Sequence, residues 1–317
     1  MPEALSYYTP VDSLLNFNEE CAVIKSDLIN ESMLVTGALS VGLSALPLLI
    51  GIDNIAKFLS SVIESIIAII KLLLEELKKI WKWLTIHAND AYASNNTFLY
   101  RYGAKLDRIS NVEVIMEGYD MTTDIMRIVN NLSVEAKTSN NDIGYINSIL
   151  LGNPKFKTRD DVLLQVNKNR AEILDIDIIG SSGSMERYVK GLDNFDQVLI
   201  DKIYGYKHNI TYKVADAINI IKNYDQRIST LTATSKVIDE QSNKEIKYLS
   251  LMKDRLISSK FVIKNARKDM VDQFNLLVEY KQRTLNDFLM AFRCISQYIN
   301  DINTQAKVIC IKALQEN

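Results

Sequence analysis

Glycine and proline are scarce in this chain, at 11 and 4 of its 317 residues. Folds built from many short strands need frequent tight turns, which these two residues supply, so their scarcity favours long helices over a β-rich architecture. Apolar residues make up 47% and charged residues 24% of the chain, which is the composition of a globular protein with a substantial core. We therefore predict a mainly α fold.

Residues that usually bind metals or form disulfides are also rare. The chain has two histidines, His87 and His208, and neither has a cysteine or carboxylate at metal-ligand spacing. Its three cysteines, Cys21, Cys294 and Cys310, are too few and too scattered for a disulfide framework, which favours a reducing assembly environment. No metal site is predicted.

Motifs typical of enzymes are missing too. The run Gly180-Ser-Ser-Gly-Ser lacks the Gly-Lys-Ser/Thr ending of a phosphate-binding loop, and its spacing differs from the serine elbow of hydrolases. No pair of carboxylates stands out from the many on the predicted helices. We therefore predict a non-enzymatic protein, without catalytic residues and without a cofactor.

The net charge of −2 conceals an asymmetry between two parts of the chain. Residues 1–205 carry 19 basic and 27 acidic side chains, whereas residues 206–317 carry 18 and 12. The opposite signs indicate either acidic partners for the C-terminal part or attraction between the two parts. We favour the attraction.

The longest uncharged segment lies near the N-terminus. Residues 32–52 form 21 consecutive positions without a charge, which is long enough to cross the apolar core of a bilayer. Gly37, Gly42 and Pro47 lie within it; they weaken a helix in water but are tolerated in membrane helices.

A second apolar segment follows and is predicted to be a helix over residues 55–85. Its charged residues Lys57, Glu64, Lys71 and Lys78 recur every seven positions, and most of the others are apolar. Such a narrow polar stripe predicts burial on nearly all sides, in protein or in lipid.

Together the two segments predict a hydrophobic helical hairpin. One interpretation places it in or on a membrane, with Trp81 and Trp83 and their neighbouring lysines at the headgroups. The other interpretation buries the hairpin in a large or oligomeric core. The charges of Glu64 and Lys71 favour this interpretation over a simple pair of membrane-spanning helices, because a charge in the middle of a bilayer is costly. The predicted membrane or subunit contacts are Leu46, Leu49, Ile66, Ile67, Ile70, Leu73, Leu74, Trp81 and Trp83.

Shorter elements are predicted in the middle of the chain. Asn95 and Asn96 are expected to cap a separate short helix, and further helical pieces are expected over residues 120–137, 141–151 and 158–174. The alternating run ILDIDII, followed by glycine and serine, also allows a small β-hairpin near residues 173–190.

The C-terminal part contains neither glycine nor proline from residue 206 onward, which predicts long helices. Apolar residues recur in steps of three and four from Met252 to Ala313, interrupted at Ser259 and Lys281. The mean spacing of about 3.6 follows a straight helix and favours packing against the chain's own helices or other subunits over a supercoiled dimer. Corners are expected at the polar runs 239–244 and 282–287.

These patterns divide the chain into four regions. We expect a polar N-terminal arm, the hydrophobic and amphipathic hairpin module, a region of mixed short helices and a long-helix domain, over residues 1–31, 32–110, 111–204 and 205–317 respectively.

One basic constellation lies in the last region. Lys253, Lys260, Lys264 and Arg267 share one helix face, at spacings of 7, 4 and 3. They either contact phosphates of nucleic acid or lipid, or form a solvated face or one paired with the acidic part of the chain. No aromatic residues are interleaved among them, which disfavours stacking on single strands.

The apolar stretch from Met33 and the following IAIIKLLLEELKKIWKWL resemble segments of helical virion proteins of large tailed bacteriophages. The similarity covers residues 33–109, about a quarter of the chain. It implies a structural or internal head protein of the virion, assembled in the host cytoplasm with other copies of itself or other virion proteins. It also implies contact with the host membrane if the protein is ejected with the genome.

A second resemblance concerns processing. Ile29-Asn-Glu31 followed by Ser32 looks like an Ile/Leu-x-Glu site of a phage prohead protease. Cleavage between Glu31 and Ser32 would release a 31-residue leader directly before the uncharged segment.

A competing resemblance is to helical pore-forming toxins, which combine a hydrophobic hairpin with very long helices. Those proteins generally place a long helix before the hairpin, whereas only about thirty residues precede it here. This resemblance implies a soluble pore-forming or membrane-permeabilising protein, the alternative to a virion protein.

Overall fold

Residues 52–121, 124–138, 141–176, 192, 194–205, 207–258 and 269–316 are described by the structure, a computed structural model of the chain. The predicted arm with its cleavage site and the first half of the predicted hairpin, with Leu46 and Leu49, lie outside these residues. So do Lys260, Lys264 and Arg267 of the predicted basic face.

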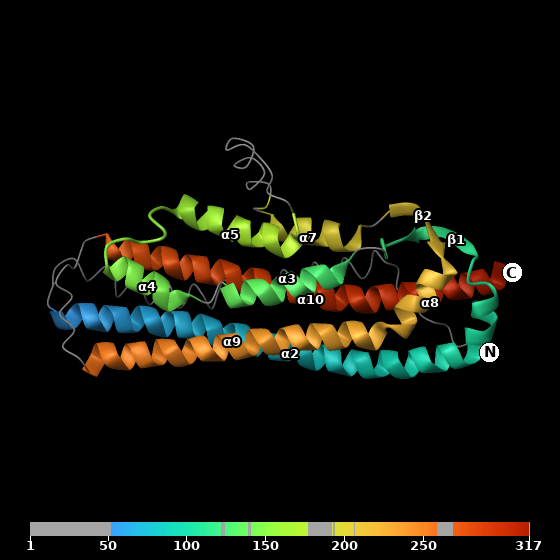
Figure 1. The fold of residues 1–317 in the computed structure, drawn as a ribbon, viewed down its shortest axis with the longest axis horizontal. Coiled ribbons are helices and arrows are strands. Elements are labelled where there is room, and N and C mark those ends of the chain that lie inside the picture. Colours follow the sequence, from blue (N-terminus) through green and yellow to red (C-terminus); the bar gives the residue numbers. More distant parts are fainter. Residues whose placement is uncertain are drawn as a thin grey trace.

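The described residues form an elongated bundle of helices (Figure 1). The three longest helices among them are α2 (Ile52–Arg108), α9 (Tyr224–Ser258) and α10 (Met270–Glu316), which run along the long axis of the molecule. The prediction of a mainly α bundle with long helices is confirmed.

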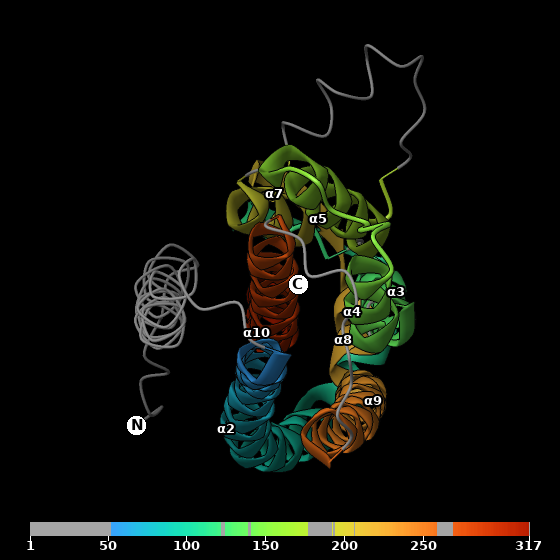
Figure 2. The ribbon, with the colours of Figure 1, turned by 90° about the vertical axis from the view of Figure 1, so that its left-hand side faces the viewer.

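Shorter helices complete the bundle. They are α3 (Ile125–Thr138), α4 (Asp142–Leu150), α5 (Arg159–Leu174), α7 (Phe195–Tyr204) and α8 (Val214–Lys222). Seen end-on, α2 and α9 lie at one side, α10 and the α3–α4 pair lie in the middle, and α5 and α7 lie at the other side (Figure 2). The helical pieces expected around 120–137, 141–151 and 158–174 correspond to α3, α4 and α5.

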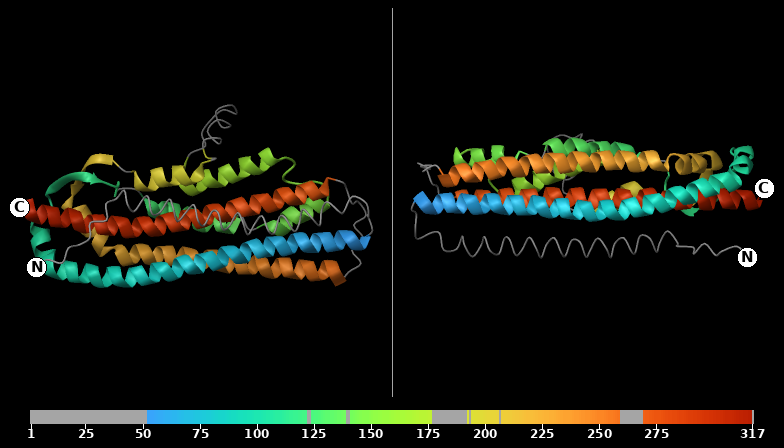
Figure 3. Two further views of the ribbon diagram at one scale, coloured as in Figure 1. Left: turned by 180° about the vertical axis from the view of Figure 1, so that it is seen from behind. Right: turned by 90° about the horizontal axis from the view of Figure 1, so that it is seen from below.

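Helix α2 has the narrow polar stripe that its sequence indicates. Lys57, Glu64, Lys71 and Lys78 are exposed, while the apolar positions between them are mostly buried. The helix packs against α9 and α10, and Figure 3 shows it running alongside α9.

The predicted break in α2 at Asn95 and Asn96 is wrong, because the helix continues unbroken to Arg108. Asn95 is 3% exposed and does not cap a helix. Its Nδ2 donates to Asn303 Oδ1 of α10 (3.0 Å) and to the carbonyl of Ile221 in α8 (3.3 Å), and Asn303 Nδ2 donates back to Asn95 Oδ1 (3.2 Å). A residue type that favours helix starts therefore serves here as a polar bridge between three helices.

Helix α10 confirms the apolar stripe from Met270 to Ala313, since its aromatic positions Phe274, Phe288 and Phe292 are each at most 2% exposed. The beginning of the predicted stripe, at Met252, belongs to α9 instead. The two predicted corners are wrong: residues 239–244 lie within α9 and residues 282–287 within α10. Residues 239–244 are polar because most of them are at least partly exposed to water, whereas Asp287 of the second run lies in the core beside a charged partner.

A two-stranded antiparallel sheet lies at the end of the bundle near the C-terminus (Figure 1). It joins β1 (Glu113–Gly118) to β2 (Lys207–Lys213), with Val114 opposite Tyr212. The hairpin expected near 173–190 is not this sheet: Ile173 and Leu174 end α5, and residues 177–190 lie outside the described part of the chain. The observed strands are far apart in sequence, and local alternation does not reveal such a pairing.

The core prediction is tested by Phe292→Ala. Phe292 is fully buried on α10, so removing its ring should lower the free energy of unfolding by about 3–5 kcal/mol. Chemical denaturation followed by circular dichroism measures the change. Tyr100→Ala is the control, because Tyr100 is 93% exposed and its loss should change stability by less than about 0.5 kcal/mol. Equal effects of the two substitutions would contradict the arrangement of the core.

Candidate functional site

The contact residues predicted on α2 face the interior of the protein. Ile66, Ile70 and Leu73 are at most 1% exposed, and Leu74 is 6% exposed. Ile67, Trp81 and Trp83 are partly buried and pack against the same core. None of the helices in the described residues is both long enough and apolar enough to cross a membrane.

The predicted basic face is represented in the structure by Lys253 alone. Its Nζ lies 2.7 Å from Glu64 Oε1, an ion pair that joins α9 to α2 and raises the pKa of Lys253. The pair lies at the surface, where such contacts contribute little to stability. It links the basic C-terminal part to the acidic N-terminal part, as attraction between the two would require.

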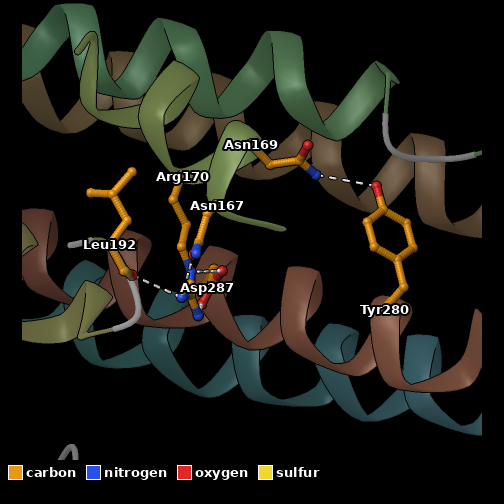
Figure 4. Close-up of polar contacts among 6 residues, drawn as sticks. All are labelled: Asn167, Asn169, Arg170, Leu192, Tyr280 and Asp287. Atoms are coloured by element: carbon orange, nitrogen blue, oxygen red, sulfur yellow. Dashed lines mark hydrogen bonds and ion pairs between the residues drawn. The ribbon is translucent and has the colours of Figure 1, made fainter. Parts of the chain in front are cut away.

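The most elaborate polar site in the described residues is a buried ion pair between α5 and α10 (Figure 4). Arg170 Nε donates to Asp287 Oδ2 (2.7 Å) and Arg170 Nη2 donates to Asp287 Oδ1 (3.0 Å). Arg170 Nη1 donates to Asn167 Oδ1 (3.0 Å) and to the carbonyl of Leu192 (2.9 Å), so it also binds the segment before α7. The Arg170 guanidinium carbon lies 5.3 Å from the centre of the Phe195 ring.

Burial governs the electrostatics of this ion pair. It raises the pKa of Asp287 to about 6, against the opposing influence of Arg170, because a carboxylate loses its hydration in the core. The two-pronged hydrogen bonding to a guanidinium compensates for that loss and fixes the orientation of both side chains.

The start of α5 sets the position of Arg170 along the bundle. Thr158 Oγ1 accepts a hydrogen bond from the Asp161 backbone N–H (3.3 Å), and the Asp161 carboxylate accepts one from the Thr158 N–H (2.9 Å). This capping box anchors the first turn of the helix. The next turns place Asn169, whose Nδ2 donates to the hydroxyl of Tyr280 on α10 (3.1 Å; Figure 4).

A second buried ionic cluster surrounds Lys281, which lies on α10 six residues before Asp287. Lys281 Nζ is 2.9 Å from Asp142 Oδ2 and 3.0 Å from Glu245 Oε2, and all three side chains are at most 5% exposed. Asp142 belongs to α4 and Glu245 to α9. Lys281 therefore holds three helices together.

Glu135 of α3 lies beside a surface cavity of about 340 Å³ between α3 and α5. Burial, together with the hydrogen bond and charge of Glu172, raises the pKa of Glu135 to about 7, although Thr138 Oγ1 donates to it (3.0 Å). The cavity is lined by Asn131, Val134, Glu135, Ala171, Glu172, Asp175 and Ile176.

Sequence inspection missed these groups, with one exception. Lys281 interrupts the apolar stripe of α10, and an interruption in an otherwise continuous stripe is the signal of a buried polar contact. Arg170, Asp287 and Glu135 give no such signal, because charged residues on a helix look the same in sequence whether they face water or another helix.

The geometry of the two ionic clusters is suited to holding helices together. Each buried charge of the Arg170–Asp287 pair and of the Lys281 cluster lies against an opposite charge from another helix. Within the described residues, no three or more His, Cys, Asp or Glu side chains are grouped so as to hold a metal ion.

No protein-family model, curated protein or solved structure matches this chain.

The contribution of the Arg170–Asp287 pair is tested by Arg170→Met. The substitution leaves Asp287 buried without its partner, which should lower the free energy of unfolding by about 3–5 kcal/mol. Arg159→Met is a matched control, because Arg159 also lies on α5 and pairs with Glu279 of α10, but its side chain is 66% exposed. It should cost less than about 1 kcal/mol. Similar losses from both variants in denaturant titrations would contradict a special role for the buried pair.

Proposed function

We propose that this chain is a non-enzymatic structural or internal virion protein of a tailed bacteriophage, which assembles by packing of its helices. The observation that carries the proposal is the extended bundle in which α2, α9 and α10 run side by side. At 1.5 Å per residue the 57-residue α2 is about 85 Å long and the 47-residue α10 about 70 Å long. Long rods of this kind offer large lateral surfaces to neighbouring subunits.

The use of the buried polar residues supports the same proposal. Arg170, Asp287, Lys281 and their partners are engaged in bonds between helices, which rigidify the bundle and specify one packing of its core, as a structural protein requires. The resemblance of residues 33–109 to phage virion proteins supplies the biological setting, in which the partners are other copies of the chain or other virion proteins.

An uncharged segment as long as residues 32–52 favours contact with protein or lipid over contact with water. The apolar face of α2 is already buried in the described residues, so we propose that this preceding segment contacts neighbouring subunits, or the host membrane when the protein is delivered. Nucleic-acid contact through Lys260, Lys264 and Arg267 is a weaker proposal, because Lys253 of the same predicted face pairs with Glu64.

Mass spectrometry of purified phage particles tests this proposal. The chain should be present in many copies per particle and should remain after the particles are treated with protease from outside. If residues 1–31 are removed during head maturation, peptides should begin at Ser32. Consistent absence of the chain from intact particles would exclude the virion assignment.

The length of the uncharged segment favours one alternative, a soluble protein that permeabilises membranes. It predicts dye release from liposomes at micromolar protein. Leu46→Asp combined with Leu49→Asp should abolish release, because two charges oppose insertion of the segment into lipid. Ile86→Asp combined with Leu151→Asp is the matched control, because these apolar side chains are 52% and 84% exposed and lie outside that segment. Liposomes that stay intact with the unaltered protein would exclude this alternative.

A further inference from the structure

The junction of α4, α9 and α10 contains an unequal number of buried charges. Asp142 is the first residue of α4 and is fully buried, Glu245 of α9 is 5% exposed, and Lys281 of α10 is fully buried. Helix α4 contacts both of the other helices, and Figure 1 shows it near their ends at one end of the bundle. The site therefore brings two carboxyl groups and one ammonium group together out of contact with water.

The two oxygens of Glu245 make bonds to different helices. Glu245 Oε1 accepts a hydrogen bond from the backbone N–H of Asp142 (3.1 Å), which is one of the unsatisfied donors at the start of α4. Glu245 Oε2 accepts from Lys281 Nζ (3.0 Å). Glu245 thus connects the N-terminus of α4 to α10, and the position of α4 depends on it.

The site holds one more carboxyl group than ammonium groups. One ammonium group neutralises one carboxylate, and a second carboxylate buried beside the first would be uncompensated. Asp142 Oδ1 is buried and accepts no hydrogen bond from the described residues, so it is available to accept one from a protonated Glu245. Burial raises the pKa of Glu245 to about 7, with Asp142 adding to the effect and Lys281 opposing it. Burial lowers the pKa of Lys281, but the two carboxyl groups outweigh it and keep the ammonium charged.

We propose that Asp142, Glu245 and Lys281 form a proton-dependent latch that fixes α4 to α9 and α10. The latch is closed while Glu245 carries a proton, and it loosens when that proton is lost. This inference rests on the geometry of the junction and is independent of the proposed role in a virion.

The direction of the pH effect follows from the raised pKa of Glu245. The closed site binds the proton more tightly than the open one, where a glutamate has its ordinary pKa near 4.5. The stability of the closed latch therefore falls as the pH rises from about 4.5 to about 7, and the full loss is present above the higher value.

Two other carboxyl groups whose pKa is raised by burial face different partners. Glu135 of α3 faces Glu172 of α5 and the charge of Lys155. Asp287 of α10 faces Arg170 of α5, Asp196 of α7 and Arg283 of its own helix. The charged groups that act on Glu245 are Lys281 and Asp142, so its titration can be isolated by substitution.

Hydrogen–deuterium exchange of the full chain at about pH 6 and pH 8, corrected for the intrinsic exchange rate, tests the latch. In the unaltered protein the protection of the α4 amides should fall about tenfold between these values, the change expected for one carboxyl whose pKa shifts from 4.5 to about 7. In Glu245→Gln the neutral amide replaces the protonated carboxyl, so the protection of α4 should be nearly the same at both values.

Three further variants make the result specific. Asp142→Asn leaves one carboxylate for one ammonium and should also remove the pH dependence, which provides a second test if Glu245→Gln does not fold. Glu240→Gln changes an exposed glutamate on the same helix and should retain the full dependence, as should Glu135→Gln on α3. Protection of α4 that is independent of pH in the unaltered chain, or equally dependent on pH in Glu245→Gln, would overturn the proposal.

Discussion

Helix α10 carries buried charges, and each of them needs a partner from another helix. Lys281 and Asp287 are at most 3% exposed on a helix whose remaining inward positions are mostly apolar. An isolated ion in such surroundings would cost on the order of several kcal/mol. Helices α4, α5 and α9 therefore have to supply the opposite charges at matching positions along the axis of α10. The arrangement of the bundle around α10 follows from this requirement.

Apolar packing alone would not specify that arrangement. The stripes of α2, α9 and α10 are built from similar side chains, and two such helices can slide by one turn with little change in the apolar area that they bury. Bonds with fixed geometry remove this freedom. The guanidinium of Arg170 donates hydrogen bonds to both carboxylate oxygens of Asp287. The reciprocal hydrogen bonds between the side-chain amides of Asn95 and Asn303 fix the position of α2 along the axis of α10. The bundle thus has a defined register as well as a large core.

The same structure changes how the apolar character of α2 is understood. A wide apolar face with tryptophans and lysines at one end is typical of helices that meet lipid, but it is equally typical of a helix surrounded by others. Here Ile66, Ile70 and Leu73 lie in the core of the bundle. The case for membrane contact therefore depends on residues 32–52, and the case for assembly depends on the outer surfaces of the long helices.

Local patterns in the chain were sufficient to predict that it is helical and which faces of the long helices are buried, because helix formation and the 3.6-residue repeat depend on near neighbours along the sequence. They also marked Lys281, as an interruption in the stripe of α10. They did not predict that Asn95 continues a helix, that β1 pairs with β2, or that Arg170 meets Asp287, because each of these depends on a partner remote in sequence. A polar residue on a helix can face water or another helix with the same local sequence around it. Only the packing of the chain brings together the groups that make one of these outcomes the more stable.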